Sequence, residues 1–161
     1  MSVTTQFSQL RQDIAGHSLV ELAERFGTPS YVYDLSKILQ RVADLQAFDT
    51  VRYAQKACSN IAILDRLRRA DVLVDAVSAG EIGRALRAGY QPSQIVYTAD
   101  VFDRDALELV IQKNVPVNVG SPDMIDQLGQ RAPGRNITLR INPGFGHGHS
   151  QKTNTGGPQS K

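Results

Sequence analysis

Apolar residues recur along this chain in two alternating rhythms, one typical of strands and one typical of helices. From residue 51 onward, strand-like patterns begin near Val51, Val72, Ile95, Val117 and Ile137, every 20 to 23 residues. Helical patterns fill the intervals, over 61–69, 79–88, 104–112 and 122–128. This alternation predicts a parallel sheet with right-handed crossovers, and the near-continuous apolar runs at 72–74 and 95–97 predict helices that cover the sheet.

The first 50 residues follow a different pattern. Apolar positions from Phe7 to Phe26 predict one or two short helices around Gly16, which end at the Gly and Pro of segment 27–29. A short strand is predicted at 31–33, followed by a helix that has Asp34 as its N-cap. We therefore expect a helical segment at 1–30 and the start of the β/α region at residue 31.

The number of β/α units predicts part of a barrel. A closed eight-stranded barrel of the TIM type needs roughly 180 residues at this spacing, whereas five units begin here, so we expect an α/β fold that is a partial (β/α)8 barrel over 31–141. Residues 142–161 are rich in Gly and His, with almost no apolar residue after Phe145, and predict a long loop of the kind that is functional or disordered. The other half of the barrel is expected to be missing, as in a truncated protein.

Composition narrows the class of protein. The 161 residues are 41% hydrophobic and 21% charged, as in ordinary globular proteins, and the net charge of +2 is too small to indicate a nucleic-acid partner. No apolar run reaches the roughly 18 residues needed to span a bilayer, and the first residues lack the pattern of a signal peptide. The single Cys58 excludes an intramolecular disulfide and fits a reducing compartment, so we expect a cytoplasmic protein.

Candidate chemistry begins with Lys56, near the carboxyl end of the strand that starts at Val51. Ligands bind at the carboxyl ends of parallel strands, and on a regular strand Ala54, Lys56 and Cys58 share one face. A lysine there can form a Schiff base with an aldehyde cofactor, although most strand lysines are solvated surface side chains. Asp75 ends the next strand, and a carboxylate there can pair with a nearby cation or ring group. Ser78 and Glu81 have the spacing of a capping box, which favours a helix start for this pair.

Together these segments resemble a known family. Tyr53-Ala54-Gln55-Lys56-Ala57 and Asp75-Ala76-Val77-Ser78-Ala79-Gly80-Glu81 are similar to motifs of the alanine-racemase-type, fold-type III pyridoxal phosphate (PLP)-dependent decarboxylases, which combine a β/α barrel with a C-terminal β domain. Further similarity lies at 97–101, 118–121 and 140–157, where the chain is most like bacterial members that convert meso-2,6-diaminopimelate to L-lysine. The resemblance covers residues 27–161.

The resemblance implies roles for individual residues. Lys56 would hold PLP as the catalytic lysine, and Asp75 and Arg140 would orient the lysine and the cofactor. A structural ion pair between Arg140 and a barrel carboxylate is the other interpretation of that residue. The 142–161 loop would act as an active-site lid, with His149 approaching the substrate, and its two closely spaced histidines do not indicate a metal site.

The resemblance also implies a homodimer for the full-length enzyme. The family's phosphate-binding glycines, its ring-stacking histidine and the acid that pairs with the pyridine nitrogen have no counterpart in this chain, so we expect the chain to be inactive alone.

Three alternatives stay open at this point. One is another enzyme of the same fold, an ornithine- or arginine-type decarboxylase or an alanine racemase. The second is a non-catalytic PLP-binding protein, against which the long loop argues because such a barrel has no use for a lid. The third is an inert fragment, or one that associates with a full-length partner.

Overall fold

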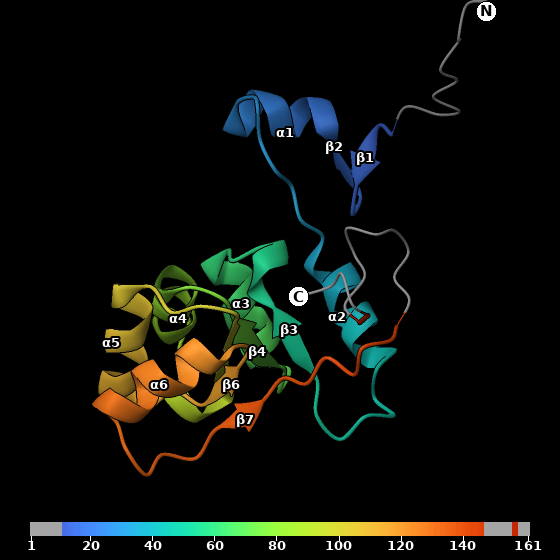
Figure 1. The fold of residues 1–161 in the computed structure, drawn as a ribbon. Coiled ribbons are helices and arrows are strands. Elements are labelled where there is room, and N and C mark those ends of the chain that lie inside the picture. The colour runs from blue at the N-terminus through green and yellow to red at the C-terminus, as the bar shows by residue number, and fades with distance from the viewer. Residues whose placement is uncertain (1–10, 147–155, 158–161) are drawn as a thin grey trace, which may run out of the picture. The chain divides into compact units, whose positions relative to one another are not determined.

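The computed structural model describes residues 11–146 and 156–157 (Figure 1). Its contacts divide the chain into two units, Met1–Asp44 and Leu45–Lys161. The first unit holds a two-stranded antiparallel sheet and two helices, and the second holds a five-stranded parallel sheet with its helices. The sequence pattern places the start of the barrel part at residue 31, and the assignment of 31–44 to the barrel stays a prediction.

Of the one or two short helices predicted around Gly16, one forms, over Leu19–Phe26, whereas the chain on either side of Gly16 is not helical. Strands β1 (Asp13–Ile14) and β2 (His17–Ser18) pair as a hairpin instead. Both residues of its turn, Ala15 and Gly16, have positive φ, which a two-residue hairpin turn requires and a right-handed helix excludes. Helix α1 (Leu19–Phe26) follows directly, capped by Ser18, and it ends at Gly27 as predicted.

The predicted strand at 31–33 does not form either. Neither sheet of the described residues includes this segment, and Tyr31 is 92% exposed. Aromatic and β-branched residues favour strands only where a neighbouring strand offers a ladder, and none pairs here. Helix α2 (Leu35–Ala43) does begin after Asp34, whose carboxylate accepts hydrogen bonds from the N–H groups of Ser36 and Lys37.

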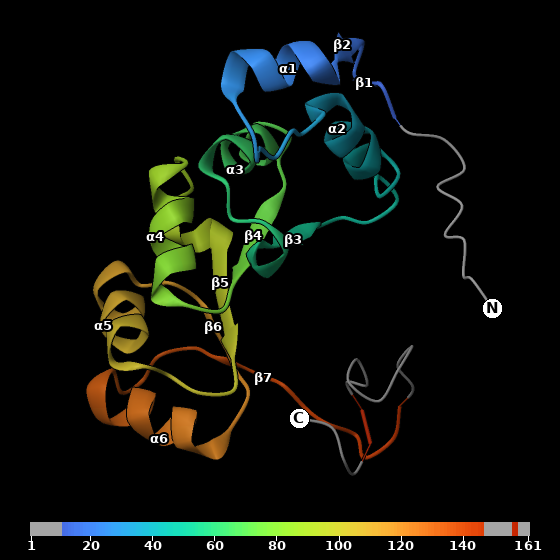
Figure 2. The ribbon, with the colours of Figure 1, turned by 90° about the horizontal axis from the view of Figure 1, so that it is seen from above.

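The second unit confirms the predicted alternation of strands and helices. Its parallel sheet runs in chain order and consists of β3 (Arg52–Ala54), β4 (Leu73–Ala76), β5 (Ile95–Ala99), β6 (Val117–Val119) and β7 (Thr138–Leu139). The connecting helices are α3 (Ile61–Arg68), α4 (Ala79–Arg87), α5 (Arg104–Lys113) and α6 (Pro122–Arg131). Figure 2 shows these four helices on the same side of the sheet, the arrangement of one part of a β/α barrel.

Local capping explains where the helices begin. Asn60, Ser78 and Asp103 each accept a hydrogen bond from the first turn of α3, α4 or α5. Two short 3-10 helices, Gln55–Ala57 (η1) and Pro92–Gln94 (η2), follow β3 and precede β5. Helix α4 ends at Gly89, as predicted, because the left-handed φ of +92° lets the Tyr90 N–H turn back to the Ala85 carbonyl.

The core lies between the sheet and its helices, on one face only. Along β4 and β5, Val74, Ala76, Ile95 and Tyr97 are buried against the helices, whereas the side chains that alternate with them are only partly buried. The apolar runs at 72–74 and 95–97 therefore do not indicate helices on both faces. The second face is the inner face of the part-barrel, where polar residues such as Asp75 and Thr98 lie beside apolar ones such as Ala54 and Val96.

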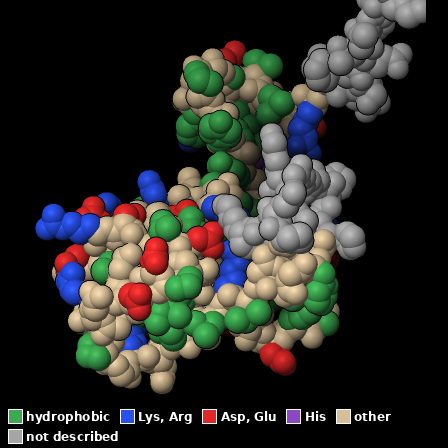
Figure 3. Space-filling model, in the orientation of Figure 1, with side chains coloured by type: hydrophobic (Ala, Val, Ile, Leu, Met, Phe, Trp, Pro, Cys, Tyr) green, Lys and Arg blue, Asp and Glu red, His purple; other side chains and the backbone are tan. Residues whose placement is uncertain are grey.

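On the face drawn in Figure 3, acidic and basic side chains are interspersed over the helical side of the second unit. No helix among the described residues is long and apolar enough to cross a membrane.

Candidate functional site

Lys56 lies at the carboxyl edge of the sheet, but it is not part of a strand. The ladder between β3 and β4 ends at the pair Ala54 and Asp75, and the chain then turns into η1, which carries Lys56. The predicted alternation of Ala54, Lys56 and Cys58 on one strand face is therefore wrong, because a 3-10 turn rotates successive side chains by about a third of a turn. The Lys56 side chain is exposed, and its amine has no hydrogen bond or ion pair with any described residue.

A hydrogen bond holds the turn that carries Lys56. The Tyr53 hydroxyl donates to the Cys58 carbonyl at 2.9 Å and so joins the residues on either side of η1. Burial of the Tyr53 ring raises the pKa of its hydroxyl. The hydrogen bond to the Cys58 carbonyl by itself lowers this pKa, but burial is the larger effect. Gln55 anchors the turn from inside, 1% exposed, and its side-chain amide has no hydrogen-bond partner among the described residues. Cys58 is half-buried.

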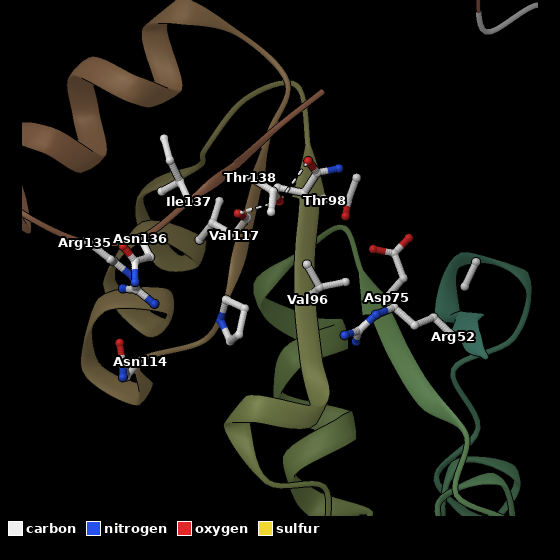
Figure 4. Close-up of a pocket in the computed structure, with 13 residues that line it drawn as sticks. Arg52, Asp75, Val96, Thr98, Asn114, Val117, Arg135, Asn136, Ile137 and Thr138 are labelled. Carbon is white, nitrogen blue, oxygen red and sulfur yellow. Dashed lines mark hydrogen bonds between the residues drawn. The ribbon is translucent and has the colours of Figure 1, made fainter. Parts of the chain in front are cut away.

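Asp75 points to the inner face of the sheet, where it lines a cavity of about 1050 Å³. Figure 4 shows Asp75, Thr98 and Arg52 at this cavity, with Arg135 on its opposite side. One oxygen of Asp75, Oδ1, is buried without a hydrogen-bond partner in the described part of the chain. The guanidinium of Arg135, which lines the same cavity, donates to the carbonyls of Val110 and Val115.

Arg140 follows β7, and its N–H continues the ladder to the Val119 carbonyl at 2.8 Å. Its guanidinium Nη1 lies 3.3 Å from Oδ1 of Asp100, the residue that follows β5. Arg140 thus forms the structural ion pair that was one of its two predicted roles. Its other predicted role, toward a cofactor, stays a prediction. Sequence reasoning missed Asp100 as the partner, because the two residues are 40 positions apart.

Ser78 and Glu81 cap α4, as expected. The Ser78 hydroxyl accepts from the Glu81 N–H at 3.2 Å, and the Glu81 carboxylate accepts from the Val77 N–H at 2.9 Å. Glu81 reaches one residue beyond the N-cap, so the pair is a variant of the capping box. The carboxylate of Glu81, a residue that is only 9% exposed, therefore serves to stabilise the first turn of the helix.

His149 lies outside the described residues. The residues at the two ends of its loop are described, and Asn142 joins them: its amide accepts from the Gly157 N–H at 3.2 Å and donates to the Gly157 carbonyl at 3.1 Å. Gly156 packs so closely on the Phe145 carbonyl that an added Cβ would lie 2.3 Å from it. Within the described residues, no group of three or more His, Cys, Asp or Glu side chains forms a metal site.

The carboxyl ends of the strands thus carry an amine on η1, after β3, and a guanidinium after β7, and the Asp75 carboxylate on β4, the strand next to β3, points to the inner face. An amine of this kind can bind an aldehyde covalently, and a guanidinium can bind an anionic group through its remaining N–H donors. Sequence reasoning missed Gly120, directly after β6 at the carboxyl edge, and Arg52, which begins β3 at the opposite end of the strand and lines the cavity. The signal that points to Gly120 is its position directly after a strand, where a glycine permits a close approach.

Comparison with known proteins adds independent information. The family model described as "Pyridoxal-dependent decarboxylase, pyridoxal binding domain" matches residues 34–161. The diaminopimelate decarboxylase of Escherichia coli K12 is 56% identical over 153 residues, which are 92% of this chain and 36% of that protein. A crystal structure of diaminopimelate decarboxylase matches with a TM-score of 0.83 and 57% identity, over 88% of this chain and 35% of that chain.

A more distant match is the lysine decarboxylase of Selenomonas ruminantium, whose crystal structure has a TM-score of 0.75 and 28% identity, over 84% of this chain and 38% of that chain. This chain spans about a third of the length of the relatives it matches.

Proposed function

From the premise that the chain belongs to the pyridoxal-dependent decarboxylases, through their pyridoxal-binding domain, we propose that it forms the N-terminal part of an enzyme that decarboxylates meso-2,6-diaminopimelate to L-lysine. The observation that carries the proposal is the 56% identity to the Escherichia coli enzyme over almost the whole chain. Identity to the lysine decarboxylase is half as high, which favours diaminopimelate over lysine as the substrate.

The chemistry of three residues of the sheet and its carboxyl edge, Lys56, Asp75 and Arg140, fits groups of PLP. The exposed Lys56 amine can take the aldehyde, and the unpartnered Oδ1 of Asp75 can accept a hydrogen bond. The guanidinium of Arg140 has N–H donors for an anionic group of the cofactor. When bound, PLP supplies the electron sink for loss of CO2.

In this proposal each residue has a separate task. Lys56 binds the cofactor through its amine, and the η1 turn, held by Tyr53, sets the direction of the lysine side chain. Asp75 accepts a hydrogen bond at its buried Oδ1 on the inner face and orients the lysine or the cofactor from there. Arg140 orients the cofactor electrostatically from the end of β7. We propose His149 as a residue of the lid that excludes water above the site.

Lys56→Arg tests the covalent role. The test uses the protein expressed from its complete reading frame. Arginine keeps the positive charge and similar length but cannot form the imine, so we expect the absorbance band of the lysine-bound cofactor to disappear and CO2 release to fall below detection. Lys113→Arg, at the exposed end of α5, is the matched control and should retain both. A cofactor band that persists in Lys56→Arg contradicts the assignment.

Substrate choice is tested by CO2 release from meso-diaminopimelate, L-lysine, L-ornithine and L-arginine, with the protein expressed from its complete reading frame. We expect release from meso-diaminopimelate alone. Release from another of these amino acids identifies a different decarboxylase of the same fold, and cofactor binding without release from any of them indicates a non-catalytic PLP-binding protein.

Assembly, compartment and the behaviour of this chain alone are further parts of the proposal. We propose a homodimer for the full-length enzyme and the cytoplasm as its compartment. We also propose that the 161-residue chain alone releases no CO2 from meso-diaminopimelate, because its cofactor pocket has residues on one side only. Turnover by the purified chain with added PLP contradicts this.

A further inference from the structure

One ion pair links the carboxyl ends of two strands, β5 and β7, that are separated by a third strand, β6. Asp100 follows β5 and Arg140 follows β7, so their ion pair passes over the end of the intervening β6. Both side chains are partly exposed, 38% for Asp100 and 31% for Arg140. The backbone of Arg140 is already held by its hydrogen bond to the Val119 carbonyl. The ion pair with Asp100 therefore restricts the rotation of the Arg140 side chain.

Gly120, directly after β6, is what allows this contact. A Cβ at residue 120 would lie 2.6 Å from the Asp100 carboxylate oxygen that binds Arg140 and 2.5 Å from the Ala99 carbonyl. The second atom belongs to the backbone, so it cannot move aside as a flexible side chain would. Any residue other than glycine here therefore displaces the end of β5 and with it the Asp100 carboxylate.

The contact leaves Arg140 with open donors. Asp100 takes one nitrogen, Nη1, and no other partner of this guanidinium occurs among the residues the structure describes. A guanidinium has five N–H donors in a rigid plane, so fixing one of them also fixes the direction of the rest. Such an arrangement orients a cation before an anionic ligand arrives, which lowers the entropy lost on binding.

We propose that Asp100 is a positioning residue that orients the Arg140 guanidinium toward the anionic cofactor, and that Gly120 makes this possible by leaving space for the Asp100 carboxylate. The inference rests on the proposed function, because it takes PLP as the ligand. Asp100 acts through Arg140 and does not itself touch the cofactor.

A double-mutant cycle on the PLP dissociation constant tests this, with the protein expressed from its complete reading frame. Asp100→Asn keeps the shape of the side chain but loses its charge, and we expect about tenfold weaker PLP binding, the effect of one charge-assisted hydrogen bond. In an Arg140→Gln background the same change should have no further effect, because the residue through which Asp100 acts is gone. Gly120→Ala should reproduce the loss with both charges present.

The matched control is Glu108→Gln. It removes another partly exposed ion pair, with Arg131 at 2.7 Å, which joins α5 to α6 away from the strand ends. PLP binding should stay within about twofold of the parent, since surface ion pairs contribute little to the fold. Thermal unfolding of each variant is also measured without PLP. An unchanged melting temperature together with weaker PLP binding indicates loss of positioning, whereas a lower melting temperature indicates loss of folding.

The outcomes distinguish this inference from the proposed function. Additive effects of Asp100→Asn and Arg140→Gln, or unchanged binding in Asp100→Asn, overturn the positioning role while the lysine-bound cofactor band still supports the proposed function. Absence of that band in the parent protein overturns the proposed function itself. If Asp100→Asn does not fold, Gly120→Ala decides, because normal PLP binding in that variant contradicts the need for this contact.

Discussion

At the scale of single residues, Tyr53 makes one hydrogen bond that spans the turn carrying Lys56. Tyr53→Phe leaves the ring in place and removes only the hydroxyl, so the Cys58 carbonyl loses its donor from this side. We expect the free energy of unfolding to fall by about 1 kcal/mol, measured by denaturant titration. Tyr31→Phe is the control, because Tyr31 is 92% exposed and should give no change. Equal stability of Tyr53→Phe and the parent would show that this bond does not hold the turn.

The individual site residues were predictable to different degrees. Lys56 and Asp75 could be proposed as site residues because the regular pattern places them near the carboxyl ends of successive strands, although Lys56 lies on the η1 turn that follows β3. The pairing of Arg140 with Asp100 could not be predicted, because it depends on the order and register of three strands rather than on any local motif. The need for Gly120 has the same origin, since its close contact is with the neighbouring strand's end.

At the scale of the elements, Gly83 inside helix α4 and Gly89 at the end of this helix should respond oppositely to substitution by alanine. Gly89 has a φ of +92°, and an added Cβ would lie 3.0 Å from the Arg68 side chain, so Gly89→Ala should destabilise the protein by about 1 kcal/mol. Gly83 lies inside α4 with open space around it, so Gly83→Ala should stabilise by about 0.5–1 kcal/mol through helix propensity.

Thermal and denaturant unfolding of these two variants measures the difference. Since both substitutions add the same methyl group near one helix, a change of the same sign in both would contradict the explanation from backbone conformation.

Helices were more predictable than the short strands and turns. A helix such as α4 carries its own signals, an N-cap at Ser78 and a stop at Gly89, within about ten residues. The β1–β2 hairpin, by contrast, depends on the conformation of two turn residues, of which Ala15 gives no signal for a positive φ. The η1 turn arises where the ladder ends and Tyr53 bonds to Cys58, and a strand pattern that continues through Lys56 does not reveal it.

At the scale of the whole molecule, the fold class was predictable because five strand patterns follow one another at four similar intervals, so an error in one unit does not change the overall prediction. What the pattern did not reveal is that only the helical face of the sheet is buried. The inner face carries polar side chains such as Asp75, Thr98 and Asn118 together with apolar ones such as Ala54 and Val96, and in a β/α barrel it is the interior that the other strands enclose.

Two buried tyrosines couple the stability of the second unit to alkaline pH. Tyr90 and Tyr97 are 2% and 1% exposed, and their hydroxyls donate to the carbonyls of Val72 and Val101. Burial raises the pKa of both groups to about 12. Below pH 10 both tyrosines are protonated in the folded and the unfolded chain, so their contribution is complete. As the pH rises from 10 to 12, the unfolded chain loses these protons and the folded chain keeps them, and the free energy of unfolding falls.

The predicted slope is about 1.4 kcal/mol per pH unit for each tyrosine within this window. Denaturant titrations of the parent and the variants at pH 9, 10, 11 and 12 measure this slope. Lysines and arginines also titrate in this range, but they are common to every variant, so the difference between variants reports on the tyrosine alone. Tyr97→Phe should lower stability at pH 9 through the lost hydrogen bond and should also flatten the decline above pH 10, since one of the two coupled groups is gone. Tyr31→Phe should leave both unchanged. A decline as steep in Tyr97→Phe as in the parent would mean that the alkaline sensitivity comes from groups other than the buried tyrosines.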